Sequence, residues 1–395
     1  MKHLQITDFT LTTALGGGLD VNFERLRLGK SGLHPCEFFD ISDLRAWVGE
    51  VAGLDEVIID KQLSAFDCRN NRLALQGLKQ DGFIESVQQA ISCYGAERVG
   101  VFIGTSTSGI HQTEKAYLSR ESETAALPDW YQYETTQNTY SVAEFVRAYT
   151  GCDGVSAAIS TACSSSAKVF ASAYRAIHSG LCDAAIVGGV DSLCLTTLYG
   201  FNSLQLLSEE LCRPSDITRN GISIGEAAGF ALLQRSQKAG GVGMLGYGES
   251  SDAFHMSSPH PEGDGAFLAM QAALHSAGMT AEQVDYINLH GTATVANDFS
   301  EAMAVNRLFG NKTPCSSTKG WTGHTLGAAG IVEIVFSLMA IKHGFMPQSL
   351  NTQQIDPNIG INILMENHFQ PVNRVLSNSF GFGGSNVSLV VGEIQ

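Results

Sequence analysis

Cys163 lies where a thiol could act as a nucleophile. An apolar, strand-like stretch precedes it (residues 155–159), and a helical pattern of small and apolar residues follows it (167–177). This order predicts a strand, a tight turn and a helix, with the thiol at the helix N-terminus. Unpaired backbone N–H groups favour a negative charge there, so we expect a lowered thiol pKa and a reactive thiolate. The alternative is a buried structural cysteine.

Two histidines further along the chain have similar surroundings. His290 lies in the run NLHGTAT (288–294), and His324 lies in STKGWTGHTLGAAG (317–330). Each follows a short apolar segment and sits in a turn rich in glycine and threonine. Glycine permits close approach of backbone or substrate, and threonine supplies hydroxyl groups. One cysteine and two such histidines, distant in sequence, form a candidate nucleophilic site.

With its other motifs, the chain resembles the β-ketoacyl-acyl-carrier-protein synthases of the thiolase superfamily, in the Cys-His-His branch. The resemblance runs nearly from end to end. Besides the cysteine and histidine segments, it rests on VGVFIGT (99–105), RPSD (213–216), GEAAG (225–229) and SNSFGFGGSN (377–386).

Alternating segments predict an α/β architecture. Residues 98–104 and 184–190 are typical of buried strands, and residues 141–149 predict a helix with Ser141 as N-cap and Glu144 three residues later. The resemblance implies more: a thiolase-like five-layered α/β/α/β/α fold built from two similar halves, although no repeat is visible in the sequence.

A turn-rich stretch near residue 240 separates the two expected halves. Residues 1–240 would form the N-terminal half, with the cysteine turn and with capping insertions at 15–75 and 110–145. Residues 241–395 would form the C-terminal half, with both histidine loops.

The resemblance implies a decarboxylative Claisen condensation. Cys163 would take an acyl group from a thioester, and malonyl carrier protein would lose carbon dioxide and attack that acyl group. The product is two carbons longer, in fatty-acid biosynthesis or a related pathway of polyketide or aryl-polyene type. A chain-length-determining or scaffold subunit of a ketosynthase heterodimer is the alternative, although such subunits lose the nucleophile.

The resemblance also assigns roles around the reacting groups. The backbone amides of Cys163 and Phe382 would form an oxyanion hole. His290 and His324 would donate hydrogen bonds through Nε2–H if their Nδ1 atoms accept bonds elsewhere. Phe382, between glycines, would gate access to the cysteine.

Other residues are expected to support this centre. Lys319, counted with the catalytic group, would pair with Glu333 in a buried ion pair. The hydroxyl groups of Thr292 and Thr294 would suit the amides of a phosphopantetheine arm, or else would form the turn. The remaining expected residues are Asp298 and Glu301, which brace the loop, Ala293, where the family usually has glycine or serine, and Thr107, in a hydroxyl-rich acyl pocket that lies partly across a dimer interface.

The formal net charge is −15, which argues against nucleic acid as a partner. The resemblance implies an acyl carrier protein, and these are usually acidic. A local basic patch is therefore expected, and two candidate clusters carry the necessary charge, unless these residues are only scattered surface charges: Lys61, Arg69 and Arg72; Lys115 and Arg120.

Cysteine usage and apolar runs bear on location and cofactors. The nine cysteines include no CxxC pair and no metal-ligand spacing, and the N-terminal residues lack the apolar core of a secretory signal. The apolar stretch 329–345 carries Glu333, Lys342 and His343, so no membrane span is expected. We expect a cytoplasmic enzyme without metal or free cofactor, since the carrier supplies phosphopantetheine. By resemblance it is a homodimer or a heterodimer with a ketosynthase-like paralogue.

A thiolase is disfavoured. Thiolases need a second cysteine in the C-terminal glycine-rich loop, and no cysteine follows Cys315 in this chain.

Overall fold

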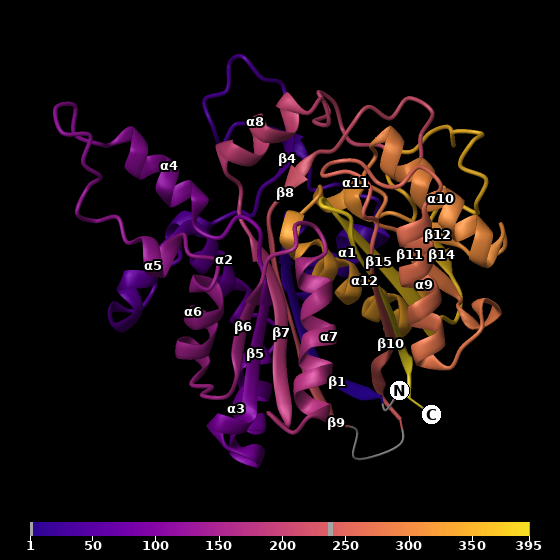
Figure 1. Ribbon diagram of the computed structural model, residues 1–395, viewed down its shortest axis with the longest axis horizontal. Helices are drawn as coiled ribbons and strands as arrows, with labels where there is room; N and C mark the ends of the chain where they lie inside the picture. Colours follow the sequence, from indigo (N-terminus) through magenta and orange to yellow (C-terminus); the bar gives the residue numbers. More distant parts are fainter. Residues whose placement is uncertain (1–2, 236–239, 395) are drawn as a thin grey trace.

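The computed structural model describes residues 3–235 and 240–394 (Figure 1). Its centre is an eleven-stranded sheet in the order β12-β11-β15-β16-β10-β1-β9-β7-β5-β6, with β2 paired to β1. The strands are β1 (Leu4–Thr13), β2 (Gly16–Gly17), β5 (Val99–Gly104), β6 (Ser156–Ile159), β7 (Ala184–Asp191), β9 (Ala227–Arg235), β10 (Val242–Ser251), β11 (Tyr286–Asn288), β12 (Cys315–Ser316), β15 (Arg374–Gly381) and β16 (Ser385–Glu393).

The sheet consists of two halves with one topology. In the first half β5 runs parallel to β6 and β7, and β9 runs antiparallel to β7 and β1. In the second half β11 runs parallel to β12 and β15, and β16 runs antiparallel to β15 and β10. The halves join where β1 pairs with β10 through Leu4–Met244 and Gln5–Gly243. The strands therefore repeat an order that the sequence does not reveal.

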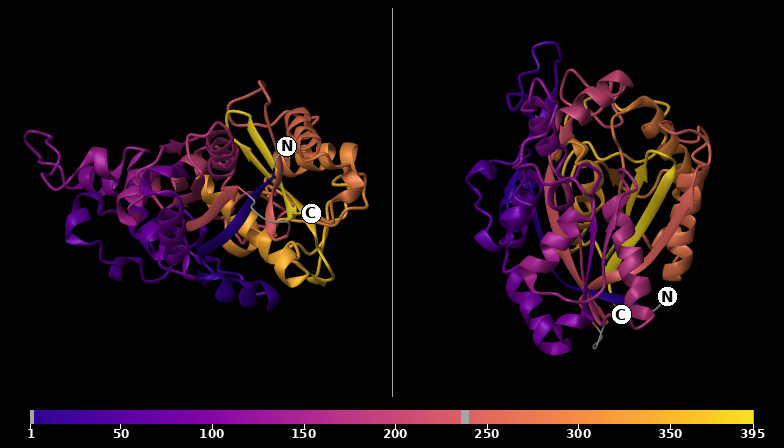
Figure 2. Two further views of the ribbon diagram at one scale, coloured as in Figure 1. Left: turned by 90° about the horizontal axis from the view of Figure 1, so that it is seen from below. Right: turned by 60° about the vertical axis from the view of Figure 1, so that its left-hand side comes forward.

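Helices form three layers around the two half-sheets. Between them, α7 (Ser165–His178) packs against α12 (Ala329–His343). The outer face of the first half is covered by α2 (Arg69–Leu78), α3 (Phe83–Tyr94) and α6 (Ser141–Thr150), and that of the second by α9 (Asp264–Ala277) and α10 (Val295–Phe309). Figure 2 shows the indigo-to-magenta and orange-to-yellow halves side by side. This is the expected α/β/α/β/α order.

The middle layer holds the largest apolar core, with Phe170, Trp321 and Phe336 among its buried side chains. One segment among the described helices, Leu326–His343, is long and apolar enough to cross a membrane, and 83% of it is buried. Because α12 packs against both half-sheets, the fold itself accounts for its apolar composition.

Shorter elements lie outside these layers. A small sheet joins β3 (His34–Pro35), β4 (Trp47–Gly49) and β8 (Ile224–Gly225). The segment with α4 (Ile110–Leu118) and α5 (Tyr133–Thr136) projects at the left of Figure 1. The other short elements are α1 (Leu19–Arg27), η1 (Leu54–Glu56), η2 (Lys61–Phe66), η3 (Ala96–Arg98), α8 (Leu195–Ser203), η4 (Ala281–Gln283), α11 (Lys319–Thr322), η5 (Leu326–Ala328), β13 (Phe345–Met346) and β14 (His368–Phe369).

The predicted strands at 98–104, 155–159 and 184–190 are confirmed as β5, β6 and β7, and the helices as α6 and α7. The predicted N-cap of α6 is wrong. Tyr140 holds that position, and Ser141 is the first helical residue. The Ser141 hydroxyl instead donates to the Thr135 carbonyl and accepts from the Asn71 amide. Of the predicted turn-rich stretch, residues 236–239 lie outside the described residues.

Candidate active site

Cys163 lies in the turn between β6 and α7. Ala162, just before it, has φ +52°, so the chain reverses sharply, and Ser164 is the N-cap of α7. The start of α7 passes so close to β5 that a Cβ on Gly104 would lie 2.4 Å from the Ser166 nitrogen. The turn thus holds the thiol just ahead of the helix, 6% exposed.

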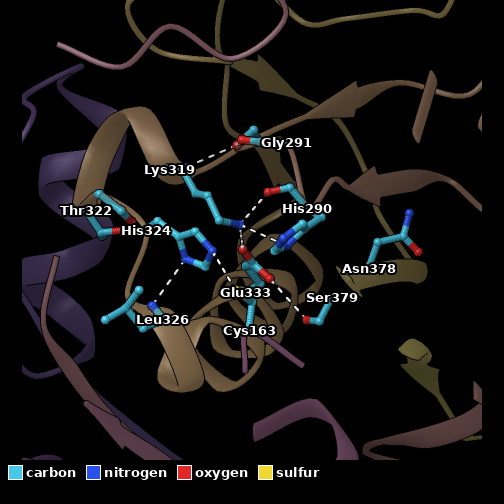
Figure 3. Close-up of polar contacts among 12 residues, drawn as sticks. Cys163, His290, Gly291, Lys319, Thr322, His324, Leu326, Glu333, Asn378 and Ser379 are labelled. Atoms are coloured by element: carbon cyan, nitrogen blue, oxygen red, sulfur yellow. Dashed lines mark hydrogen bonds and ion pairs between the residues drawn. The ribbon is translucent and has the colours of Figure 1, made fainter. Parts of the chain in front are cut away.

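Both histidines reach this thiol from the second half of the sheet (Figure 3). His290 follows β11, and His324 lies between α11 and η5 on the connection that leaves β12. The ligand-type atoms of Cys163, His290 and His324 all lie within 4.8 Å of one another. Nε2 of His324 is 3.1 Å from the cysteine sulfur, so the fold brings together the three residues that the sequence singled out.

The hydrogen bonds behind the two rings set their tautomers. The Leu326 N–H donates to Nδ1 of His324 over 3.1 Å, and Nζ of Lys319 lies 3.4 Å from Nδ1 of His290. Burial and the Lys319 charge hold the pKa of both histidines well below the usual range, so both rings are neutral. With Nδ1 accepting, each ring carries its proton on Nε2 and can donate it into the site.

The thiol itself differs from expectation. Burial raises the pKa of Cys163 to about 11, although the Lys319 charge and a hydrogen bond from the Phe382 N–H act in the opposite direction. The predicted lowered pKa is therefore wrong for the resting site. Desolvation of a thiolate in this enclosed place outweighs the Lys319 charge and the Phe382 N–H. A thiolate formed here is stabilised by donors such as Nε2–H of His324.

Lys319 connects the histidine loops to α12. Its ammonium forms the predicted buried ion pair with Glu333 and donates to the His290 carbonyl. Glu333 also accepts from the Ser379 hydroxyl over 3.4 Å, and burial raises its pKa to about 7. Both side chains are 2% exposed, so the charge of Lys319 is held close to the two rings rather than in solvent.

Two carboxylates brace the His290 loop. Glu301 accepts the N–H groups of His290 and Gly291, each over 2.8 Å. Asp298 accepts the Ala293 N–H over 3.2 Å. Ala293 adopts φ +67°, a left-handed conformation that costs a non-glycine residue about 1 kcal/mol. This backbone geometry explains why a small residue suits the position.

Phe382 lies in the turn between β15 and β16. Gly383 and Gly384 have φ of +81° and +74°, and Phe382 turns its N–H toward the cysteine sulfur. Its half-buried ring lies 5.5 Å from the ring of Phe201, centroid to centroid. The turn is held from outside, because Gly383 donates to the Met256 carbonyl over 2.8 Å.

A pocket opens in front of the cysteine and the two histidines. Thr292 and Thr294 line it, and their hydroxyls are 2.9 Å apart. Thr294 also caps α10 by accepting the Asn297 N–H, so the turn-forming alternative holds for this residue as well. Several other lining residues belong to none of the sequence motifs, among them Phe201, Asp252 and His255.

Thr107 does not line this pocket of the chain. It is 2% exposed, and its hydroxyl donates to Asp191 over 3.0 Å. The hydroxyls of Thr105 and Ser106 bind the same carboxylate. Within this chain these hydroxyls form a buried hydrogen-bond network. The acyl pocket expected partly across a dimer interface stays a prediction.

The two predicted basic clusters partly merge. Arg69, Arg72 and Lys115 line one hollow, together with Asp55 and Asp67 among others. Arg69 is buried against Glu226, and Arg72 pairs with Asp67 over 2.6 Å. Only the more exposed side chains remain for a partner, namely Lys61, Lys115 and Arg120.

The two histidines do not offer a metal suitable atoms. Their donor types and spacing resemble a zinc site. Zinc-binding histidines, however, usually donate a hydrogen bond from the nitrogen that does not bind metal. Here both Nδ1 atoms accept, so the Nε2 atoms that face the sulfur carry protons instead of free lone pairs.

Comparison with known proteins agrees with this geometry. Residues 12–239 match the N-terminal domain of β-ketoacyl synthase, and residues 243–353 match its C-terminal domain. 3-oxoacyl-[acyl-carrier-protein] synthase 2 of Rhizobium meliloti is 32% identical over 424 aligned positions, covering 99% of both chains. The mitochondrial 3-oxoacyl-[acyl-carrier-protein] synthase of Arabidopsis thaliana is 36% identical, covering 100% of this chain and 94% of the relative.

A solved structure is also close. One chain of a ketosynthase in complex with its chain length factor, from Xenorhabdus doucetiae, is 37% identical and superimposes with a TM-score of 0.91. The match covers 100% of this chain and 98% of that one.

Proposed function

The chain belongs to the β-ketoacyl synthase family and is a condensing enzyme of fatty-acid or polyketide-type biosynthesis, and from this membership we propose how its residues divide the work. Cys163 holds the acyl group, and His290 and His324 stabilise the negative charge that develops on the malonyl thioester. The observation that carries the proposal is the pair of Nε2–H donors, with His324 3.1 Å from the sulfur.

In the first half-reaction the Cys163 sulfur attacks the carbonyl carbon of an acyl thioester. The new carbon–sulfur bond replaces the bond to the carrier's thiol, which leaves with the proton that the cysteine gives up. The oxyanion of the tetrahedral intermediate accepts from the N–H groups of Cys163 and Phe382. Such donors are each worth about 10² to 10³ in rate.

In the second half-reaction a malonyl thioester loses carbon dioxide. The electrons of the broken carbon–carbon bond move toward the thioester oxygen, where Nε2–H of His290 and His324 can donate. The resulting enolate carbon attacks the acyl-cysteine carbonyl, and the Cys163 sulfur leaves. The product is a 3-oxoacyl thioester two carbons longer, still on the carrier.

The substrates reach the cysteine on the phosphopantetheine arm of an acyl carrier protein. Thr292 and Thr294 line the pocket and are suited to bind the amides of this arm, and Phe382 gates the way to the sulfur. Lys319 and Glu333 keep the ring of His290 in place. The arm arrives with the carrier, so the reaction uses no free cofactor or metal.

The enzyme is proposed to act as the catalytic member of a dimer. Likeness to a ketosynthase that was solved with its chain length factor supports a ketosynthase-like partner, and the retained Cys163 supports the catalytic side of such a pair. The alternative partner is a second copy of this chain. All nine cysteines, each within the described residues, are free thiols, which supports a cytoplasmic location.

Intact-protein mass spectrometry with acyl carrier protein tests the proposal. Wild-type protein should gain one acyl group, and Cys163→Ala should gain none. Adding malonyl carrier protein should then remove the adduct and yield a product two carbons longer. If no primer forms an adduct, the chain acts instead as a partner subunit, and a paralogue that co-purifies should then supply the activity.

A further inference from the structure

Asp191 is a buried carboxylate that the chemistry described so far does not use. It ends β7, is 0% exposed and accepts hydrogen bonds from six groups of both halves of the molecule. These donors are the hydroxyls of Thr105, Ser106 and Thr107, the backbone N–H groups of Ser106 and Thr107, and the N–H of Gly327.

Gly327 links this carboxylate to the active site. It lies in η5, three residues after His324, and donates to Asp191 over 2.5 Å. A Cβ on Gly327 would lie 2.7 Å both from the Asp191 oxygen and from the Ser106 nitrogen. The turn therefore sits directly on the carboxylate, with no room for a side chain between them.

The residue between His324 and this contact is strained. Leu326 has φ +54°, which is costly for a branched side chain and persists only where neighbours impose it. Its N–H is the group that donates to Nδ1 of His324. The Leu326 N–H therefore points at Nδ1 of His324 only while Leu326 keeps its left-handed conformation.

We propose that Asp191 is the positioning residue for His324. Its hydrogen bond to Gly327 holds the strained turn, the turn aims the Leu326 N–H at Nδ1, and Nε2–H is left facing Cys163. This inference rests on the proposed role of His324 as a donor through Nε2–H. It assigns the first half of the fold a part in orienting a catalytic group of the second half.

The charge of Asp191 has a second, opposite effect. It raises the pKa of the Cys163 thiol, after the larger effect of burial. Removing the Asp191 charge should therefore favour the thiolate. Losing its hydrogen bond to Gly327 should reduce the share of His324 that carries its proton on Nε2. Because Nε2–H of His324 stabilises the thiolate, these two effects on the Cys163 pKa oppose each other.

The test is Asp191→Asn in the full-length protein. The amide keeps the shape but turns N–H groups toward donors that need an acceptor. Loss of the correct histidine tautomer can cost up to about 10⁴ in kcat. Because Asp191 acts through one turn, we expect kcat for condensation to fall by about 10- to 100-fold, with KM for malonyl carrier protein nearly unchanged.

Two readouts separate positioning from folding. In protein labelled with ¹⁵N-histidine, the His324 signals, identified by their loss in His324→Ala, should shift from the Nε2–H tautomer toward a mixture. The second readout is the split between the kinetic constants: kcat for condensation should fall while KM for malonyl carrier protein stays near the wild-type value. The proposal is overturned if Asp191→Asn retains the wild-type tautomer and kcat.

Asp216→Asn is the matched control. Asp216 is also buried, and it accepts the N–H groups of Gln353 and Gln354 across the two halves, without reaching the pocket. Equal effects in both variants would reduce Asp191 to a structural role. If Asp191→Asn does not fold, Ser106→Ala is the second variant; it removes a hydroxyl that donates to Asp191 and accepts from the Gly327 N–H. It should show the same tautomer shift to a smaller extent, and absence of the shift would overturn the proposal.

The tautomer is read without substrate. A wild-type protein that forms no acyl adduct would therefore refute the proposed function and leave this result standing.

Discussion

The two halves of the molecule place different chemistry at corresponding strand ends. In the first half, β5 and β7 end in the hydroxyl-bearing segment 105–107 and in Asp191, which bind one another. In the second half, β11 and β15 occupy the same places in the sheet, and they end near His290 and Phe382, which line the pocket.

The difference lies in where the donors point. Around Asp191 every hydroxyl of 105–107 has a protein acceptor, so these groups only hold the chain. In His290, Nδ1 accepts a hydrogen bond from Lys319, so Nε2–H has no protein partner among the described residues in this arrangement and faces the pocket. The two half-sheets share one topology but differ in their polar groups. In the first half the hydroxyls and the carboxylate bind each other and stabilise the fold, whereas in the second half a histidine N–H points into the pocket and is available to substrate.

The third pair of corresponding connections supplies one reacting group from each half. Cys163 lies between β6 and α7, and His324 lies between β12 and α12. Because α7 and α12 pack together between the half-sheets, these two groups meet at 3.1 Å. The site therefore depends on both halves, although most of the donors come from the second.

The largest expected effect on kcat comes from removing corresponding polar groups from the two halves. His290→Ala deletes a pocket donor and should lower kcat for condensation by about 10² to 10³, while acylation of Cys163 falls less. Thr107→Val deletes a hydroxyl with a protein partner and should lower kcat less than about tenfold. The measurements are steady-state turnover and the rate of adduct formation by mass spectrometry.

A comparable loss in both variants would contradict the division between scaffold and reaction centre. It would mean that the first-half loop also contacts substrate.

A buried carboxyl group in each half should make the free energy of unfolding depend on pH, with opposite signs for Glu301 in the second half and Asp216 in the first. Burial raises the pKa of Glu301 to about 7, so its folded form holds a proton more tightly than the unfolded chain. The stability it contributes is complete below pH 4.5 and is lost as pH rises through 7. Relative to Glu301→Gln, the wild-type free energy of unfolding should fall by about 3 kcal/mol across this range.

The contribution of Asp216 to the free energy of unfolding has the opposite pH dependence. Burial by itself would raise its pKa, but hydrogen bonds from Gln354, Thr218 and Gln353 outweigh burial and lower the pKa to about 2. Its contribution is present above pH 3.8 and is lost as pH falls toward 2. The measured quantity is the wild-type free energy of unfolding minus that of each variant, from denaturant unfolding between pH 2 and 8. This difference should fall with rising pH for Glu301→Gln and rise with pH for Asp216→Asn, and slopes of the same sign would refute the assignment.

The sequence predicted what depends on nearby residues. Apolar runs indicated β5, β6 and β7, and glycine- and threonine-rich motifs marked the three groups that meet in the pocket. The sequence did not predict the features that depend on residues far apart in the chain, such as hydrogen-bond partners and burial. Asp191 lies 84 residues from Thr107 and takes its hydroxyl, Glu226 lies 157 residues from Arg69 and buries it, and only the closed pocket explains the high pKa of Cys163.

Adjacent glycines in the Phe382 turn offer a finer test. Gly383 and Gly384 are both left-handed, but a Cβ on Gly383 meets nothing within 4 Å, whereas one on Gly384 would lie 2.8 Å from Asp252. Both alanine variants carry backbone strain of about 1 to 2 kcal/mol, and only Gly384→Ala also displaces a neighbour. We expect about a tenfold lower acylation rate for Gly384→Ala and a smaller loss for Gly383→Ala.

Rates of adduct formation at fixed acyl-carrier concentration measure this difference. Equal losses would show that backbone conformation alone, and not the contact with Asp252, controls the position of Phe382.

Surface charge should produce the smallest difference between the halves. Lys115 is exposed beside the basic hollow of the first half, whereas Lys342 is exposed near the end of α12, about 20 Å along that helix from the site. Lys115→Glu and Lys342→Glu each make the net charge of −15 more negative by two. If carrier protein docks near the hollow, only Lys115→Glu should raise the KM for carrier protein, by about threefold at low salt and less at high salt. Equal increases would instead show that the whole acidic body repels an acidic carrier.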